Sequence, residues 1–472
     1  MRILLTGTTG YIGQRLLPVL LEKGHEVVCC VRDKKRFDAS KYNSSKLTVI
    51  EVDFLQKKTL ESVPENIDAA YYLIHSMSSP KGDFEDLEKQ SAENFKDRIQ
   101  QTNAKQVIYL SGIINEEKLS KHLSSRKQVE EVLASGNFHL TTLRAAIIVG
   151  SGSASFEIIR DLVEKLPVMI APRWLKTKSQ PIAIRNVIEF LYGVLMNEET
   201  FDQNFDIGGP EILSYNQMLM KFAKVRNLKR TIIQVPVMTP KLSSYWLYFV
   251  TSTSYKLAVN LVNSMKVEVI ARENDLHEKL GINLLSYEEA VQRAFDQIAQ
   301  QEVLSSWTDA LSGNALEKGI SQLIEVPVHG CFKDERKIAV SDEDEVMKKV
   351  WSIGGQQGWY YANWLWRIRG FLDKLVGGVG LRRGRKNASD ITPGDSLDFW
   401  RVIYANRAEK RLLLYAEMKL PGEAWLEFNI KNNALYQTAT FRPRGLGGRI
   451  YWFSVWPFHG LIFKGMLKNI AK

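Results

Sequence analysis

Cysteine is scarce in this chain of 472 residues. Cys29 and Cys30 are adjacent and Cys331 lies far away, so the three thiols form neither a disulfide framework nor a metal site of the usual ligand spacing. Uncharged apolar runs of about 18 residues, which could cross a bilayer, are also missing. A first strand predicted to start at residue 1 leaves no room for a secretory signal. From these absences we expect a cytoplasmic protein without an integral membrane segment.

The formal net charge of +10 does not by itself identify an anionic partner. The basic residues are scattered, and their densest group, Arg382, Arg383, Arg385 and Lys386, lies in a glycine-rich loop. We therefore expect no nucleic-acid partner and interpret the charge as a solvated basic surface that also attracts phosphate groups. Peripheral membrane contact through residues 451–463, aided by this charge, is an alternative.

The first residues predict a nucleotide cradle. An apolar strand at residues 1–5 is followed by a Gly-x-x-Gly-x-x-Gly turn and a helix over residues 14–23. Gly7 allows the sharp turn from strand to helix, Gly10 lets the backbone approach a pyrophosphate, and Gly13 lets the helix pack closely on the strand. Unpaired N–H groups at the start of the helix would then face the phosphates.

Short β-branched strands alternate with helical stretches as far as about residue 150. This alternation predicts an α/β domain with a doubly wound parallel sheet, which binds its ligand at the carboxyl ends of the strands. A smaller mixed segment continues this domain to residue 298. The predicted strands lie near residues 2–6, 26–31, 47–52, 69–74, 106–111 and 139–144.

A polar connector at residues 299–325 separates this first domain from a second one at residues 326–472. Eight of the eleven tryptophans lie in the second domain, which favours either a packed aromatic core or a cavity for a lipophilic ligand. Alternating stretches predict an α+β domain with antiparallel strands at residues 412–420, 424–430 and 434–441.

Two helices are predicted in this second domain. Ser341 and Asp344 have the spacing of a capping box, which predicts the start of one helix. The other is expected to begin at about His459.

Residues 1–298 resemble the atypical, extended-type short-chain dehydrogenase/reductases. The resemblance rests on the glycine spacing and on short stretches at residues 52–54, 71–77, 109–112, 143–145 and 150–156. In one subgroup of these proteins a domain of unknown function follows, and residues 358–360, 366–370, 394–395 and 421–425 are similar to it. The order of predicted elements in this second domain also resembles the START-like (SRPBCC) helix-grip fold.

The resemblance implies a set of cofactor-binding residues. Asp53, beside Phe54, would accept a hydrogen bond from the adenine amine, although it could also cap a loop. His75 and Ser76 would lie beside the cofactor, although His75 could be a core histidine. The pyrophosphate would be surrounded by Gly7, Thr9, Gly10, Tyr11, Ile12 and Gly13.

Arg32 directly follows the second predicted strand, where an NAD enzyme has an acidic residue for the ribose 2′-hydroxyl. Its guanidinium can instead form a bidentate pair with a 2′-phosphate. We therefore expect NADP(H) rather than NAD(H). Asp33 argues mildly for NAD(H), and Arg32 could simply face solvent.

The catalytic pattern departs from this family. Its reductases use a Tyr-x-x-x-Lys pair, and alignment on residues 129–130 places His122 at the tyrosine position and Arg126 at the lysine position. Histidine can exchange a proton near neutral pH, whereas arginine keeps its charge. Ser111, at the family's serine position, could polarise a carbonyl. We predict no metal ligands.

The leading hypothesis is an NADP(H)-dependent oxidoreductase for a hydrophobic carbonyl- or quinone-like substrate, which the second domain presents or covers. One alternative is a catalytically weak NAD(P)-binding redox sensor or assembly protein. Another is a sugar-nucleotide epimerase, which the missing tyrosine disfavours.

Overall fold

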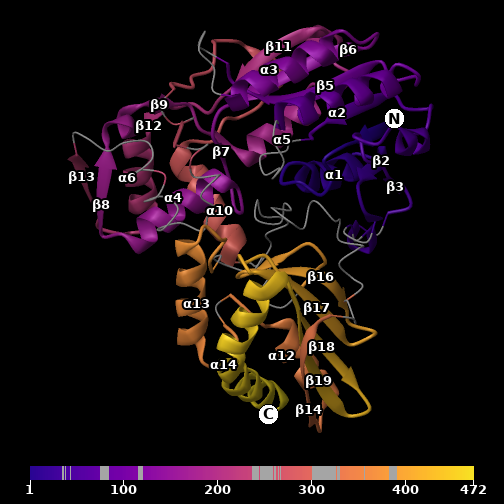
Figure 1. Ribbon diagram of the computed structural model, residues 1–472. Coiled ribbons are helices and arrows are strands. Elements are labelled where there is room, and N and C mark those ends of the chain that lie inside the picture. The colour runs from indigo at the N-terminus through magenta and orange to yellow at the C-terminus, as the bar shows by residue number, and fades with distance from the viewer. Residues whose placement is uncertain are drawn as a thin grey trace. The chain divides into compact units, whose positions relative to one another are not determined.

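The computed structural model describes residues 1–74, 84–114, 121–235, 267–299, 330–381 and 391–472, apart from positions 35, 36, 38, 43 and 356. It also describes a few isolated positions between 244 and 265, and residue 326. The described residues fall into two compact units, one up to residue 299 and the other from residue 326 (Figure 1). The predicted connector lies outside the described residues except at its first position, so its boundaries stay predictions.

A seven-stranded sheet forms the centre of the first unit, with the strand order β11-β6-β5-β4-β1-β2-β3. Every neighbouring pair is parallel. This is the doubly wound order, which reverses direction between β1 and β4, and it confirms the predicted fold class. The strands are β1 (Arg2–Leu5), β2 (Glu26–Val31), β3 (Leu47–Glu51), β4 (Ala69–Tyr72), β5 (Gln106–Gly112), β6 (His139–Ala145) and β11 (Gln203–Ile207).

Helices cover both faces of this sheet because successive side chains of each strand point to opposite sides. Ile3 and Leu5 pack in the core beneath α1 (Gly13–Glu22) and α5 (Ile184–Gly193). Leu4 packs in the opposite core, beneath α2 (Phe84–Ile99) and α3 (Lys121–Ala134) (Figure 1). The carboxyl ends of the strands are thereby left for loops.

The remainder of the first unit is a smaller group of helices and two-stranded pairs. The helices α4 (Ala154–Lys165), α6 (Tyr215–Val225) and α10 (Tyr287–Ala299) meet through a cluster of three phenylalanine rings, Phe156, Phe222 and Phe295. The paired strands are β7 (Ile148–Val149) with β10 (Ile182–Ala183), β9 (Lys178–Ser179) with β12 (Leu213–Ser214), and β8 (Val168–Pro172) with β13 (Thr231–Val235). Short helical segments are Ala39–Tyr42, Lys57–Ser62, Arg173–Lys176, Glu198–Thr200 and α9 (Leu276–Lys279).

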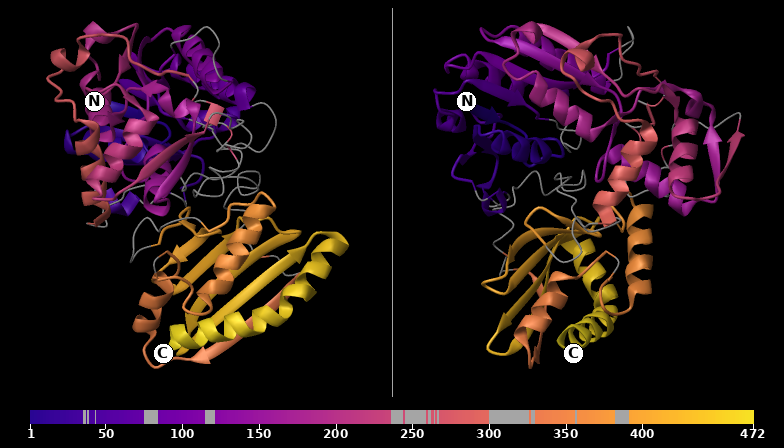
Figure 2. Two further views of the ribbon diagram at one scale, coloured as in Figure 1. Left: turned by 90° about the vertical axis from the view of Figure 1, so that its left-hand side faces the viewer. Right: turned by 180° about the vertical axis from the view of Figure 1, so that it is seen from behind.

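The second unit is an antiparallel sheet with helices, as the sequence predicted, in the strand order β14-β19-β18-β17-β16-β15. Figure 2 shows the helices α13 and α14 on the same side of this sheet. The strands are β14 (Phe332–Ala339), β15 (Ser396–Leu397), β16 (Trp400–Asn406), β17 (Arg411–Ala416), β18 (Gly422–Lys431) and β19 (Ala434–Pro443). The helices are α12 (Glu343–Trp351), α13 (Asn363–Leu375) and α14 (Gly445–Ala471). The START-like resemblance stays a prediction.

The helix predicted after the 341–344 capping box is present as α12, but its predicted cap and the predicted start of the last helix were wrong. Asp342, rather than Ser341 with Asp344, caps α12, because its carboxylate accepts the N–H groups of Asp344 and Glu345 at 2.9 and 3.0 Å. The last helix begins at Gly445 rather than near His459, and it continues through Pro457. Its buried face packs on β14 and β19, and this tertiary packing outweighs the hydrogen bond that proline removes.

A two-residue turn joins β18 to β19. Asn432 and Asn433 both have positive φ, 52° and 54°, which is the backbone of a type I′ hairpin turn. Asparagine tolerates this conformation better than most residues. The turn fixes the long register in which Gly422 pairs with Pro443.

The tryptophans of the second unit mostly fill its interior. Six of the eight are buried: Trp351, Trp359, Trp366, Trp400, Trp425 and Trp452. The Trp359 ring lies 5.1 Å from that of Trp366 and 6.2 Å from that of Trp400, and its Nε1 donates to Asp398 at 2.6 Å. This packing favours the core-filling interpretation. Trp364 and Trp456 are exposed.

Candidate functional site

The glycine turn after β1 has the tight packing that its spacing predicted. Gly7 has a φ of 63°, and a Cβ there would overlap the carbonyl of Leu73. A Cβ on Gly13 would overlap the carbonyl of Gly7 and stand 2.9 Å from the Cα of Thr8. A Cβ on Gly10 would meet only the carbonyl group of Gly7 among described atoms within 4 Å, with its oxygen at 3.0 Å, so the other side of Gly10 is open. The turn is therefore packed from behind and accessible in front.

Threonine side chains fix this turn at the position where the strand order reverses. Thr6 Oγ1 donates to the carbonyl of Tyr71 at 2.9 Å and accepts from the N–H of Leu73 at 3.0 Å, which ties the end of β1 to the end of β4. Thr8 Oγ1 donates to the carbonyl of Leu5 at 2.8 Å. Ligands of doubly wound sheets bind at this position.

The start of α1 offers free donors to an anion. Among the described residues, the N–H groups of Thr9 and Ile12 have no acceptor. The first turn of α1 contains no acidic side chain. The positive end of the helix dipole and these N–H groups suit a pyrophosphate.

Tyr11, within the turn, has a buried hydroxyl group and contacts Arg15. The guanidinium of Arg15 lies 3.9 Å from the Tyr11 ring centroid, and Arg15 donates to the carbonyls of Tyr11 at 3.0 Å and Ser151 at 2.8 Å. Burial raises the pKa of Tyr11 to about 12, so its phenol stays protonated. The sequence analysis did not identify Arg15, whose contact with Ser151 joins segments 136 residues apart.

Arg32 and Asp53, which were predicted to bind the adenosine part of the cofactor, differ in their surroundings. Arg32 follows β2, is exposed, and has no ion pair with another described residue. Asp53 caps the chain after β3: its Oδ1 accepts from the N–H of Leu55 at 3.1 Å and its Oδ2 from Gln56 at 2.9 Å. Each oxygen keeps a free lone pair, so an adenine contact stays a prediction.

The surroundings of Phe54 are those of a core residue, and its predicted cofactor contact stays a prediction. Its side chain is buried in the core and packs on Phe95, with 5.5 Å between the ring centroids, because the strand end turns it under α2. Its backbone carbonyl accepts from Asn94 at 2.7 Å. His75 and Ser76 lie outside the described residues.

Ser111, near the end of β5, is a buried hydroxyl without a partner. The residue is 6% exposed, and among the described residues its Oγ makes no hydrogen bond. Leaving a buried hydroxyl unpaired costs free energy, so such a group near the carboxyl end of a strand, where doubly wound sheets bind their ligands, is a candidate substrate contact.

Arg126 lies on α3 beside the same end of β5. Its Nη1 donates to the carbonyl of Leu110 at 3.2 Å and to Tyr109 Oη at 3.4 Å. Burial lowers the pKa of Arg126, but Tyr109 and Glu88 raise it by more, so the guanidinium stays charged. His122 lies in the same helix, and its side chain is outside the described part. The catalytic assignments stay predictions.

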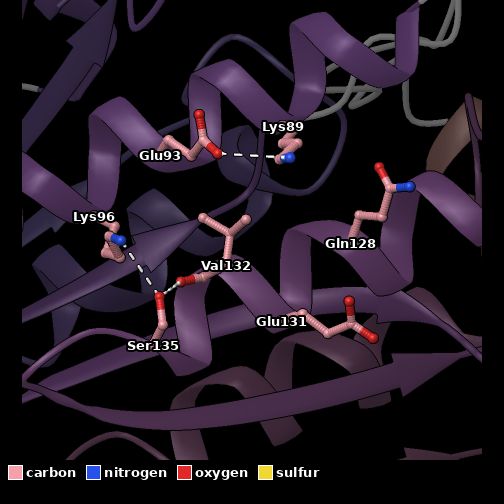
Figure 3. Close-up of a pocket in the computed structure, with 7 residues that line it drawn as sticks. All are labelled: Lys89, Glu93, Lys96, Gln128, Glu131, Val132 and Ser135. Atoms are coloured by element: carbon pink, nitrogen blue, oxygen red, sulfur yellow. Dashed lines mark hydrogen bonds and ion pairs between the residues drawn. The ribbon is translucent and has the colours of Figure 1, made fainter.

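A groove lies between α2 and α3, apart from the glycine turn (Figure 3). Charged and polar side chains line it, and they pair with one another: Lys89 lies 3.9 Å from Glu93, and Lys96 lies 3.3 Å from Ser135. It contains none of the predicted site residues. No group of potential metal ligands occurs among the described residues, and none of the helices described there is long and apolar enough to span a bilayer.

Two protein families match separate parts of the chain. Residues 7–157 match the family described as NAD(P)H-binding, and residues 329–466 match the family described as protein of unknown function (DUF2867). The first match covers the glycine turn and Ser111, and the second covers the antiparallel unit.

Known proteins are similar to about 60% of the chain at low sequence identity. Photosystem II assembly factor Ycf39 of Synechocystis sp. is 21% identical over 290 residues, which cover 60% of this chain and 86% of that protein. A Citrobacter sp. triphenylmethane reductase complexed with NADP(H) has a TM-score of 0.51 at 15% identity, over 62% of this chain and all of its own. A nucleoside-diphosphate-sugar epimerase from Staphylococcus aureus has a TM-score of 0.52 at 12% identity over the same shares. The two structures support the Rossmann-type fold.

Proposed function

We propose an activity for this chain, whose first unit is an NAD(P)-binding Rossmann domain of the atypical short-chain dehydrogenase/reductase type and whose second carries the DUF2867 domain. The activity is NADP(H)-dependent reduction of a hydrophobic carbonyl- or quinone-like substrate. The observation that carries it is the buried Ser111 hydroxyl near the end of β5, which has no hydrogen-bond partner among the described residues. Strand β5 belongs to the same sheet as β1, which leads into the glycine turn.

In this proposal, separate residues bind separate parts of the cofactor. The N–H groups of Thr9 and Ile12 hold the pyrophosphate, and the open side of Gly10 admits it. Arg32, which has no other described ion-pair partner, binds the 2′-phosphate and gives the preference for NADP(H). Bound NADPH supplies the hydride.

The chain's own side chains then act on the substrate oxygen. Ser111 donates its hydroxyl proton in a hydrogen bond to the oxygen and stabilises the charge that develops there. In the direction of reduction, the imidazole of His122 donates a proton to this oxygen. Arg126 remains a fixed positive charge, held by Leu110 and Tyr109, and takes no part in proton transfer.

The second unit presents the hydrophobic substrate in this proposal. Its buried indoles Trp366 and Trp400 each have an Nε1 without an acceptor among the described residues, which could serve a ligand oxygen. Cys29 and Cys30 are buried free thiols, which agrees with a reducing, cytoplasmic location.

Loss of NADPH absorbance tests the activity directly, with quinones, enones and aldehydes screened as substrates of the full chain. We expect turnover with at least one apolar compound, and loss of a titrating group near neutral pH from the rate profile of His122→Ala. An unchanged pH profile in this variant would remove His122 from the mechanism. Tight NADPH binding without turnover of any compound would overturn the reductase proposal.

The second candidate is an NAD(P)-binding sensor or assembly protein with little turnover. It is favoured by the loss of the Tyr-x-x-x-Lys pair, by the engagement of Arg126 with protein groups, and by similarity to an assembly factor. Binding of NADP(H) that changes the protease sensitivity of the chain, without turnover, would support it. A sugar-nucleotide epimerase is a third candidate, and bound oxidised coenzyme with conversion of a sugar nucleotide would be its signature.

A further inference from the structure

Helix α13 presents apolar side chains to solvent on its outer face. Its opposite face is buried through Trp366, Gly370 and Asp373. The exposed residues follow the i, i+4, i+7, i+8, i+11, i+12 spacing of one helix face. They are Trp364, Ile368, Phe371, Leu372, Leu375 and, directly after the helix, Val376, with exposed fractions between 47% and 62%.

Helix α14 likewise has one buried face and exposes apolar side chains on the other. Its buried face, which includes Trp452, Phe463 and Met466, packs on the sheet. Its exposed apolar residues lie mainly on the opposite face of its amino-terminal half and centre. They are Leu446, Ile450, Phe453, Trp456, Phe458 and Leu461, with exposed fractions between 45% and 74%.

The two helices lie close together on one side of the sheet (Figures 1 and 2). Arg369 Nη2 donates to Tyr451 Oη at 3.4 Å, and the Trp366 and Phe463 rings lie 6.3 Å apart. Twelve of the twenty large hydrophobic side chains that are exposed in the described residues belong to these two helices and Val376. We call this surface the α13–α14 face. Packing within the unit does not account for it, because both helices already bury their other sides.

The exposed charges that the two helices themselves contribute have one sign. Helix α14 contains no Asp or Glu, and the single acid of α13, Asp373, is fully buried and accepts from the N–H groups of Gly380 and Lys419. Arg367 and Lys374 flank the apolar stripe of α13. Lys464 and Lys468 continue the outer face of α14 toward its carboxyl end and are exposed. An apolar stripe with only basic neighbours complements an anionic surface that has an apolar interior.

We propose that the α13–α14 face docks on an anionic lipid bilayer, with both helices lying in the plane of the interface. Trp364, Phe453 and Phe458 enter the boundary between headgroups and acyl chains, where aromatic rings are favoured. The lysines and arginines pair with lipid phosphates. A protein partner or second copy would not need a purely basic surround. This surface lies outside the proposed cofactor site, so it is independent of the reductase proposal.

Sedimentation of the full chain with lipid vesicles tests the proposal. One set contains phosphatidylcholine alone, and the other contains added phosphatidylglycerol. We expect binding to the anionic vesicles that weakens as salt is raised. Phe453→Ser should lower partitioning about tenfold, because it removes one buried aromatic side chain from the interface. Lys464→Glu with Lys468→Glu should remove most of the anionic preference.

Ile212→Ser is the matched control, since Ile212 is an apolar residue of the first unit with a similar exposed fraction, 49%. It should bind vesicles like the original chain. Equal sedimentation with both vesicle sets, or unchanged binding by Phe453→Ser, overturns the proposal. If the original chain does not bind vesicles and Phe453→Ser melts at a much lower temperature, the face is covered within the protein itself and the proposal is overturned. A dimer that this substitution dissociates, without vesicle binding, assigns the face to a second copy.

Discussion

Gly13 lies directly against the carbonyl of Gly7, six residues earlier, so that a Cβ on Gly13 would overlap that oxygen. The contact places the first turn of α1 on the end of β1 and sets the direction in which its free N–H groups point. The backbone of the turn cannot yield without moving Thr8, whose Cα lies 2.9 Å from the same Cβ position.

Gly13→Ala should therefore shift the glycine turn. We expect a loss of about 1–3 kcal/mol in the free energy of unfolding and NADPH affinity reduced about tenfold or more. Chemical unfolding and calorimetric titration measure the two effects. The matched control is Gly460→Ala in α14, where nothing lies within 4 Å of the new Cβ, and it should gain roughly 0.5–1 kcal/mol. Normal NADPH binding by Gly13→Ala would contradict the role of this contact.

Arg32→Ala should lower the affinity for NADPH by about tenfold to a hundredfold, because a charge-assisted pair with the 2′-phosphate is lost. The affinity for NADH should not change. Lys105→Ala is the control, since this exposed lysine directly precedes β5 at the amino edge of the sheet. Calorimetric titration measures the affinity of each variant for NADPH and NADH. If Arg32→Ala keeps the preference for NADPH, Arg32 does not determine that preference.

Ser111→Ala should leave NADPH affinity and the free energy of unfolding nearly unchanged, because the hydroxyl has no described partner to lose. Turnover should fall about a hundredfold if this hydroxyl stabilises the substrate oxygen. Ser125→Ala offers the contrast: its hydroxyl donates to buried Glu88, so the substitution should lower stability and affect the rate less. Full turnover by Ser111→Ala would remove the residue from the site.

His459 should make the second unit less stable in mild acid. Burial lowers its pKa to about 4, with Asp334 raising and Arg336 lowering it, and its Nδ1 has no described partner. The unfolded chain takes up the proton near pH 6.5, so the unfolding free energy falls between about pH 6.5 and 4, by at most roughly 3 kcal/mol. Below the folded-state pKa this contribution levels off.

His459→Phe tests this pH dependence, because an aromatic ring can keep the contacts with Trp452 and Phe463. The variant should lose this part of the slope of unfolding free energy against pH, whereas His277→Asn, at a more exposed histidine, should keep it. Identical slopes for His459→Phe and the original chain would show that another group titrates.

The sequence predicted those features that depend on local spacing. The six predicted strands of the first sheet and the glycine turn were found because β-branched runs and a glycine triplet determine them within a few residues. Helix α13 was not predicted, although its apolar side chains recur at the spacing of one helix face. That spacing does not distinguish a buried stripe from the exposed one that the structure has. The true start of α14 was hidden by Pro457 and by the glycines before it.

The site was predicted less completely for a related reason. Ser111 was identified from a strand end, but its lack of a partner depends on which groups surround it in space. The bridge from Arg15 to Ser151 joins distant segments and leaves no local signal. The cofactor contact predicted for Phe54 stays a prediction. The burial of its ring against Phe95 depends on packing between segments about 40 residues apart, which leaves no local signal in the sequence.

The Asn432–Asn433 turn has a consequence for the order in which the second unit folds. Strands β18 and β19 need to close a loop of only two residues, which costs little chain entropy and is fast. Strand β14 pairs with the other edge of β19, with Ala339 opposite Ala434, and must close a loop through almost the whole unit. The hairpin can therefore act as a nucleus to which β14 attaches late. Until then the outer edge of β19 lacks its partner strand, and a nascent chain is most prone to pair with another copy at that edge.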